Sequence, residues 1–237
     1  RVASALAENY THELLKTSET KKAIILVVSS DKGLCGGYNS SLYKSVRNFI
    51  KDNSECDFEL RFIGRKVREL LAREGFSSAK NYVYEKADPD FFEAETVANE
   101  LKEEFKSGRV GKVYIAFNSF VSAIEFNSMV SQVLPMTVDE SEKEQLVKDF
   151  PMDFKYEPSS KEILDNLIPE VVNTSIFTAM LDAIAAEHAT RMTAMDNATG
   201  NCKDLIKDLT LTANKLRQAA ITTELTEIVS GAESLNA

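Results

Sequence analysis

Residues 23–29, Ala-Ile-Ile-Leu-Val-Val-Ser, form a continuous apolar run that is rich in β-branched side chains. A short run without alternation of polar and apolar residues predicts a strand buried on both faces, as in a parallel sheet. The glycine-rich residues 31–39 follow at once and predict a tight turn. Because helical spacing begins over residues 42–50, the strand, turn and helix together indicate an α/β domain.

Strands and helices continue to alternate through the first two thirds of the chain. The pattern predicts further strands over residues 58–63, 82–84, 113–117 and 123–133, and further helices over residues 67–71 and 91–105. The last of these helices follows Pro89 and Asp90, a favourable helix start. We therefore predict a small Rossmann-like α/β domain over residues 21–158, with a parallel or mixed sheet and helices packed on it.

The residues from 159 onward have a different pattern. No proline follows Pro169, which is tolerable near a helix start, and only Gly200 and Gly231 interrupt the helical spacing. A helix of about 60 residues would be roughly 90 Å long. Apolar and small residues recur along it in steps of three or four, a spacing typical of a coiled coil; this seam consists of Phe177, Leu181, Ile184, His188, Met192, Met195, Thr199, Cys202, Ile206, Leu209, Ala213, Leu216 and Ala220. The alternative is a helical hairpin that turns at Gly200.

The predicted fold is thus an α/β domain followed by a very long C-terminal helix over residues 159–237. The seam needs a second helix to cover it. Residues 1–15, with Val2, Leu6 and Leu14 on helical spacing, are too few to cover more than a short part. We expect the second helix to come from another chain, or from an N-terminal helix that this sequence has lost.

Composition excludes several classes of function. The 28 Lys and Arg against 37 Asp and Glu give a net charge of -9, and no basic run is present, which disfavours a nucleic-acid surface. Cys35, Cys56 and Cys202 are widely spaced and odd in number, as expected for a reducing compartment. The longest apolar stretch, residues 23–28, is too short to cross a bilayer, so we expect contact with a membrane only through partners. The chain begins with Arg1, which suggests a fragment or a processed form.

The sequence predicts no catalytic, cofactor or metal site. The glycines of residues 31–39 do not follow the spacing of a phosphate-binding loop, and Tyr38 and Asn39 stand where such a loop carries Lys followed by Ser or Thr. His12 and His188 have no Cys or second His at metal-ligand spacing. Met192 and Met195 are interpreted as soft packing residues of a helix interface.

Four segments of the chain carry recognisable motifs. They are the C-terminal residues 221–232 (ITTELTEIVSGA) and, before them, residues 31–37 (DKGLCGG), 191–198 (RMTAMDNA) and 214–219 (NKLRQA). The first resembles the signature of the γ subunits of F-type ATP synthases, and the other three resemble further segments of that family, in the same order. The resemblance covers nearly the whole chain, except for the long basic N-terminal helix of the family. It implies that residues 1–20 are a remnant of that helix and its linker, and that the helices form an antiparallel coiled-coil shaft.

The resemblance implies a rotor, a central stalk that has no catalytic site of its own. Such a subunit turns inside the α3β3 hexamer and also contacts the ε subunit and the c-ring. It couples proton flow to ATP synthesis or hydrolysis at the β subunits. The implied location is the cytoplasmic face of a bacterial plasma membrane, with the matrix side of the mitochondrial inner membrane as the alternative. Two other classes remain open from the residues alone: a coiled-coil scaffold protein, and a small-molecule enzyme built on the α/β domain.

The resemblance also implies residues that contact partners. Lys32 and Cys35 would lie near the acidic loop of a β subunit, and Arg217 and Gln218 would meet a β-subunit loop in the collar of the hexamer. Phe154 and Tyr156 would lie at the foot of the shaft near the c-ring and ε, although an edge strand ending in proline is the simpler interpretation of that segment. The complete set of predicted contacts is Lys32, Cys35, Phe154, Tyr156, Arg217, Gln218, Thr222 and Glu224.

Overall fold

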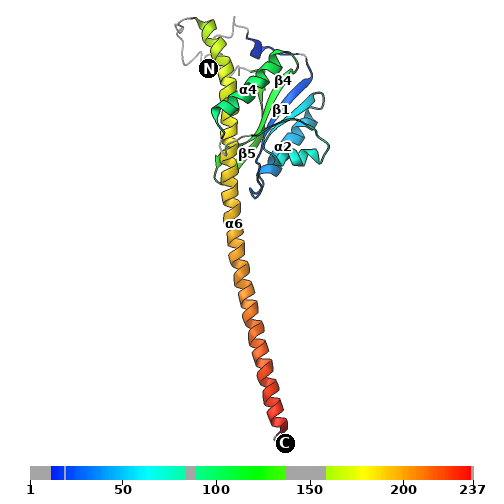
Figure 1. Ribbon diagram of the computed structural model, residues 1–237, viewed down its shortest axis with the longest axis vertical. Coiled ribbons are helices and arrows are strands. Elements are labelled where there is room, and N and C mark those ends of the chain that lie inside the picture. The colour runs from blue at the N-terminus through cyan, green and yellow to red at the C-terminus, as the bar shows by residue number, and fades with distance from the viewer. Residues whose placement is uncertain (1–11, 19, 84–88, 137–158, 236–237) are drawn as a thin grey trace. The chain divides into compact units, whose positions relative to one another are not determined.

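The structure is a computed structural model that describes residues 12–18, 20–83, 89–136 and 159–235 (Figure 1). The chain divides into two compact units, residues 1–191 and residues 192–237. The first contains the sheet, its helices and the first part of the long helix. The second consists of the rest of that helix, and each unit is described by itself.

A five-stranded sheet forms the centre of the first unit, in the order β3-β2-β1-β4-β5. Its strands are β1 (Lys22–Val28), β2 (Asp57–Ile63), β3 (Ser78–Tyr82), β4 (Lys112–Ser122) and β5 (Glu125–Leu134). The first four pair in parallel, and β5 is antiparallel to β4. The mixed sheet with β1 at its centre confirms the predicted fold class.

One strand was predicted in the wrong place. The strand expected over residues 82–84 lies instead at Ser78–Tyr82. This segment is at the edge of the sheet and is largely exposed, so it lacks the apolar run by which the other strands were found.

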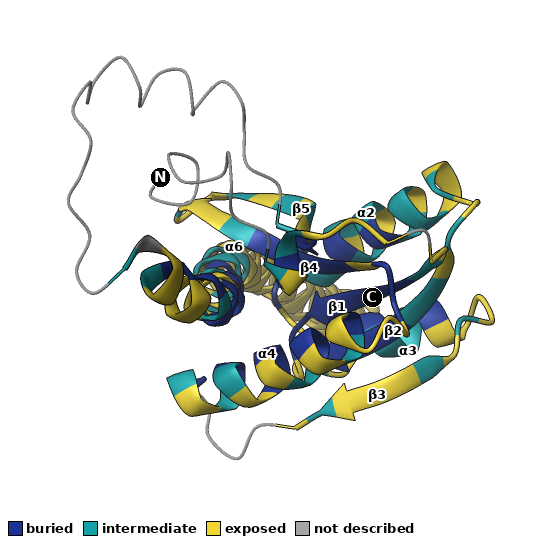
Figure 2. Ribbon diagram, turned by 90° about the horizontal axis from the view of Figure 1, so that it is seen from above, coloured by how far each residue is buried: buried dark blue, intermediate teal, exposed yellow. Residues whose placement is uncertain are grey.

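Helices cover both faces of the sheet (Figure 2). On one face α2 (Tyr38–Asp52) and α3 (Lys66–Ala72) pack against alternate strand residues, including Ile25, Phe62 and Tyr114. On the other face α4 (Phe91–Lys106) and the long helix α6 (Ser160–Leu235) pack against the intervening residues, including Leu26 and Ile115. The alternation explains why β1 reads as a continuous apolar run, because both of its faces are covered.

Hydrogen bonds hold the segment before β1 and the first turn of α4 in place. The 3-10 helix η1 (Glu13–Leu15) places Leu14 in the core beside α4, and its carbonyl accepts a hydrogen bond from Met136 N–H at 3.1 Å. The helix α4 begins with a capping box in which Asp90 accepts from the backbone and the Glu93 side chain accepts from the Asp90 N–H. The predicted start of this helix is therefore confirmed.

The helix α6 is continuous from Ser160 to Leu235, a length of 76 residues. It passes through Gly200 without a break, so the hairpin alternative is wrong. Pro169 lies inside the helix, nine residues after Ser160. A proline inside a helix removes one backbone donor, a cost that packing in the core can offset.

Two different faces of α6 are apolar. The face buried against the α/β core comprises Leu164, Ile168, Val172, Ile176, Ala179, Met180, Ala183 and Ala186. The predicted seam lies on another face, where Leu181 is 44% exposed and His188 is also exposed. In the second unit the seam residues Ile206, Leu209 and Leu216 are exposed as well. Phe177, at the start of the seam, packs against the core, whereas the seam residues of the second unit are exposed within the described part of the chain. This exposure is expected if the partner helix lies elsewhere.

The α6 segment over residues 161–232 is long and apolar enough to cross a membrane by length and composition. The core helix of a soluble protein passes the same test, and Ile176 and Met180 of this helix are buried against the sheet. Burial in the core is therefore a sufficient reason for their apolar character.

The predicted boundary at residues 158 and 159 stays a prediction. Residues 137–158 lie outside the described part of the chain. The division between compact units falls at residues 191 and 192, inside α6, because the first part of the helix belongs to the core of the α/β domain.

Gly64 provides a test of how closely the chain is packed after β2. Its φ is +86°, and a Cβ atom there would lie 1.9 Å from the Ser29 carbonyl oxygen. We expect Gly64→Ala to lower the free energy of unfolding by about 3 kcal/mol or more, because a clash adds to the backbone strain. Gly75→Ala is the matched control, since Gly75 has a φ of +90° with open space around it; strain alone costs about 1 kcal/mol. Urea unfolding measures both, and equal losses would contradict the close approach.

Candidate functional site

The loop after β1 is held by a compact set of hydrogen bonds. Ser30 Oγ donates to the Lys32 carbonyl at 2.8 Å, and Asn39 Nδ2 donates to Ser30 Oγ at 2.7 Å and to Cys35 Sγ at 3.1 Å. Ser30 and Cys35 are buried. These contacts close the strand-to-helix turn that the glycines predicted, and they use Asn39 for structure rather than for binding phosphate.

Tyr38, the first residue of α2, fastens this loop to α6. Its hydroxyl donates to the Ala183 carbonyl at 2.9 Å, and Asn118 Nδ2 donates to the Tyr38 carbonyl at 3.0 Å. Ser128 Oγ in turn donates to Asn118 Oδ1 at 2.6 Å. Burial raises the pKa of the Tyr38 hydroxyl well above its ordinary value, with a further upward contribution from Glu187. The hydroxyl therefore stays protonated and remains a donor.

The outer part of the loop is accessible. Asp31, Lys32 and Gly33 are exposed, and Leu34 is 77% exposed with a φ of 61°. A non-glycine residue in the left-handed region is held there by its surroundings. Cys35 is only 3% exposed, so its side chain faces the loop interior while Lys32 faces solvent. Contact of either residue with a partner stays a prediction.

The predicted contacts near the C-terminus all lie on the exposed second unit. Arg217 and Glu224 are seven residues apart and so share one side of α6, whereas Gln218 and Thr222 are four apart and share another. All four are exposed. The Thr222 hydroxyl donates to the Gln218 carbonyl of its own helix at 2.9 Å. The same bond to the carbonyl four residues earlier is made by Thr199, Thr210, Thr212, Thr223 and Thr226.

Phe154 and Tyr156 lie outside the described residues. Their predicted place near the foot of the shaft stays a prediction.

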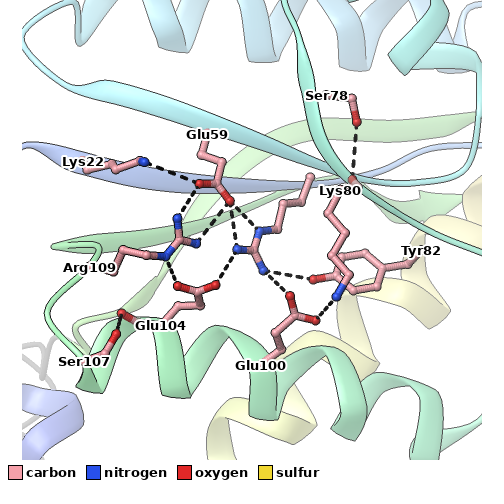
Figure 3. Close-up of polar contacts among 10 residues, drawn as sticks. Lys22, Glu59, Ser78, Lys80, Tyr82, Glu100, Glu104, Ser107 and Arg109 are labelled. Atoms are coloured by element: carbon pink, nitrogen blue, oxygen red, sulfur yellow. Dashed lines mark hydrogen bonds and ion pairs between the residues drawn. The ribbon is translucent and has the colours of Figure 1, made fainter.

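Sequence reasoning missed an ion-pair network centred on Arg61 of β2. Figure 3 labels the partners of this arginine, Glu59, Glu100, Glu104 and Tyr82. The Arg61 guanidinium is 3% exposed and contacts Glu59 at 2.8 Å, Glu100 at 2.7 Å and Glu104 at 3.0 Å. Its Nη1 also donates to the Tyr82 hydroxyl at 3.2 Å. The network therefore joins β2 and β3 to α4. An arginine inside an apolar strand was the available signal, because a buried charge requires partners.

Arg109, after α4, extends the network. It pairs with Glu59 at 2.8 Å and also with Glu104. The hydrogen bond from Arg109 lowers the pKa of Glu59 to about 2, against the opposing effect of burial and with further help from Arg61. Arg109 likewise lowers the pKa of Glu104. Paired in this way the carboxylates stay ionised, which suits a structural network better than proton transfer.

A second buried charge lies between α4 and α6. Lys102 Nζ donates to Asn173 Oδ1 at 2.7 Å and to the Pro169 carbonyl at 3.5 Å. Burial lowers the pKa of Lys102, and Lys106 adds to this effect while Glu170 opposes it. Among the residues that the structure describes, no group of three His, Cys, Asp or Glu could hold a metal ion. Lys102 thus attaches α4 to α6.

Known proteins are similar to this chain in both sequence and fold. The family model described as ATP synthase matches residues 1–235. An ATP synthase gamma chain of Heliobacterium modesticaldum is 38% identical over 235 residues, covering 98% of this chain and 80% of that protein. One of Lachnoclostridium phytofermentans is 35% identical over 232 residues, covering 96% of this chain and 79% of its own length.

Solved structures agree with this relationship. A chain of the Tetrahymena thermophila mitochondrial ATP synthase, from a structure of its central stalk and c-ring, superposes with a TM-score of 0.61 at 25% identity. The match covers 83% of this chain and 84% of the other. A chain of the Euglena gracilis mitochondrial ATP synthase has a TM-score of 0.66 at 16% identity, covering 96% and 80%, and shows the shared fold.

The matched family model places this protein among the subunits of the ATP synthase. Within that complex, the chain belongs to the ATP synthase gamma chain family. It is therefore a rotor subunit of a membrane-associated complex, not the enzyme that carries the catalytic sites, as the resemblance implied.

The Arg61 network predicts how the stability of the chain depends on pH. The folded pKa of Glu59 is about 2, below the ordinary value of 4.5, so the unfolded chain binds the proton more readily. The stabilisation by Glu59 is complete above the ordinary value and is lost as the pH falls from about 4.5 to about 2. We expect Glu59→Gln to flatten the fall of the urea midpoint in this range.

Glu103→Gln is the control for this measurement. Glu103 lies on α4, and among the described residues its ion pair is with Lys106 of the same helix at 3.6 Å. The control should keep the acid dependence of the unsubstituted chain. If Glu59→Gln kept it too, the network would not be the source of the acid sensitivity.

Proposed function

We propose that this chain transmits torque in an F-type ATP synthase, between an ion-conducting c-ring and the β subunits of an α3β3 hexamer. The observation that carries the proposal is the difference in burial between the two parts of α6. One part of this 76-residue helix is packed into the α/β core, and the other exposes its apolar seam. A helix anchored at one end and free to pair at the other is suited to link two different assemblies.

The second unit supplies the contacts expected of the collar of the hexamer. Arg217 carries a guanidinium that can hold a carboxylate through two parallel hydrogen bonds, and Gln218 adds a neutral donor and acceptor beside it. Because both are exposed in the described chain, they are available to a β-subunit loop. Within the next two turns, Glu224 extends the side of α6 that carries Arg217, and Thr222 extends the side that carries Gln218.

The loop after β1 supplies a second proposed contact. Lys32 is exposed on a loop that Tyr38 ties to α6. An exposed lysine in this position pairs with an acidic β-subunit loop only when the rotor faces that subunit. Such a pair is weak when solvated, so it favours one orientation without locking it.

The mechanism needs no chemistry in this chain. Nucleotide affinity at each β subunit and the orientation of the rotor are coupled through binding free energies, so a change in one shifts the other. We place the α/β domain at the ε subunit and the c-ring, with residues 154 and 156 near the foot. The location is the cytoplasmic face of a bacterial plasma membrane, which the bacterial gamma chains among the relatives support. The mitochondrial matrix side remains the alternative.

The collar contact can be tested in the assembled complex with Arg217→Ala combined with Gln218→Ala. We expect ATP-driven proton pumping per ATP hydrolysed to fall, because a charged hydrogen bond of this kind shifts an equilibrium about tenfold. Lys215→Ala with Thr212→Ala is the control on the same helix, outside the predicted contacts. Pumping like the unsubstituted complex in the double variant would show that these two side chains do not couple the rotor.

The exposed seam can be tested by hydrogen exchange over residues 202–220. In the isolated chain we expect fast exchange and self-association, because an uncovered apolar stripe gives a long helix no tertiary support. In the complex the same amides should be protected. Strong protection in a monomeric isolated chain would mean that the helix is covered by its own domain, and the torque proposal would fail.

A further inference from the structure

Two hydrogen bonds between side chains hold the first part of α6 to the α/β domain, and they come from different elements. Lys102 on α4 donates to Asn173 Oδ1 at 2.7 Å, and both side chains are buried. Ser119 on β4 donates to Asp182 Oδ2 at 3.1 Å. No other function described above uses either contact.

The two contacts lie on opposite sides of α6. Asn173 and Asp182 are nine residues apart, and nine residues are about two and a half turns of an α-helix. The buried apolar face, which includes Ile176 and Ala179, lies between them. Figure 2 shows this part of α6 running between α4 and β5.

The apolar face alone does not fix the rotation of the helix. Apolar burial is non-directional, so a helix can rotate about its axis through a small angle and keep much of its buried apolar area. Hydrogen bonds are directional and weaken steeply when misaligned. If α6 turned about its axis, Asn173 and Asp182 would move in opposite directions relative to the sheet. Any such turn would therefore break both contacts and leave the Lys102 ammonium buried without its amide acceptor.

A third contact limits movement along the axis. The Tyr38 hydroxyl donates to the Ala183 backbone carbonyl at 2.9 Å in a buried position. Ala183 lies on the buried apolar face, which around the circumference of α6 is between Asn173 and Asp182. The three bonds together define one setting of α6 on the domain.

We propose that Lys102 and Ser119 are positioning residues that fix the rotational setting of α6 on the α/β domain, so that torque passes between domain and helix without slip. The inference rests on the proposed function, because only a chain under torque needs this restraint. It adds to that function the specific side chains through which torque passes between the helix and the domain.

The test uses the assembled ATP synthase with Lys102→Met combined with Ser119→Ala, reconstituted in vesicles. ATP hydrolysis and ATP-driven proton uptake are measured in the same preparation. We expect hydrolysis to persist while protons moved per ATP fall to about half or less, since each lost bond shifts the equilibrium between settings about tenfold. Each single variant keeps one flanking contact and should lose less than the double variant.

The control combines Lys106→Met with Ser175→Ala. Lys106 lies on α4, as Lys102 does, and Ser175 lies on α6. Lys106 pairs with Glu103 of its own helix, and Ser175 bonds to the Val171 carbonyl of its own helix. Rescue separates positioning from mere stability: in the Ser119→Ala background, Asn173→Asp keeps an acceptor for Lys102 and should stay coupled, whereas Asn173→Leu should slip.

An unchanged ratio of protons to ATP in the double variant would overturn the inference. So would a parallel loss of hydrolysis and pumping through failed assembly, because that shows a role in stability alone. Failure of the unsubstituted complex to pump would count against the proposed function instead. In that case the distribution of distances between spin labels at positions 106 and 178 of the full chain decides the inference. This distribution should broaden in the double variant, and an unchanged distribution would overturn the inference.

Discussion

The structure depends on the burial of one face of α6 against the central sheet. This face fills the side of the sheet that α4 leaves open, and without it Leu26, Ile115 and Phe117 would lose part of their cover. Apolar burial is the dominant favourable term in folding, so the first part of the helix cannot leave without opening the core. The remaining part of the helix meets no such demand. One continuous element is thus fixed along part of its length and available along the rest.

Buried charges complete the attachment of α4, and through α4 that of α6. The Arg61 network ties α4 to β2 and β3, and Lys102 ties the same helix to Asn173. Both charges are matched by hydrogen-bonding partners, as buried charges must be. Because neighbouring turns of α4 carry Glu100, Lys102 and Glu104, the helix acts as a polar bridge between the sheet and the long helix.

The sequence was informative where apolar spacing was strong. The run at residues 23–29 predicted the central strand, and the steps of three or four along α6 predicted one long helix. The edge strand β3 was misplaced because exposure removes the apolar signal. The long helix was predicted from residue 159, and α6 spans Ser160–Leu235. Among candidate contacts, Arg217 and Gln218 are exposed together with all the described residues around them on the second unit. The inward direction of Cys35 could not be predicted, since it depends on hydrogen bonds from Asn39 that only the folded turn brings together.

The threonines of the second unit give α6 an unusual surface. Thr199, Thr210, Thr222 and Thr226 each turn the hydroxyl hydrogen inward to a carbonyl of their own helix. Their outward surface is then mainly methyl groups, with no free hydroxyl donor to form a strong bond with whatever surrounds it. A surface that satisfies its own polar groups has few deep energy minima as it moves past another surface. In a rotating helix these positions would present methyl groups to neighbouring subunits, whereas charged side chains such as Arg217 would supply the directional contacts.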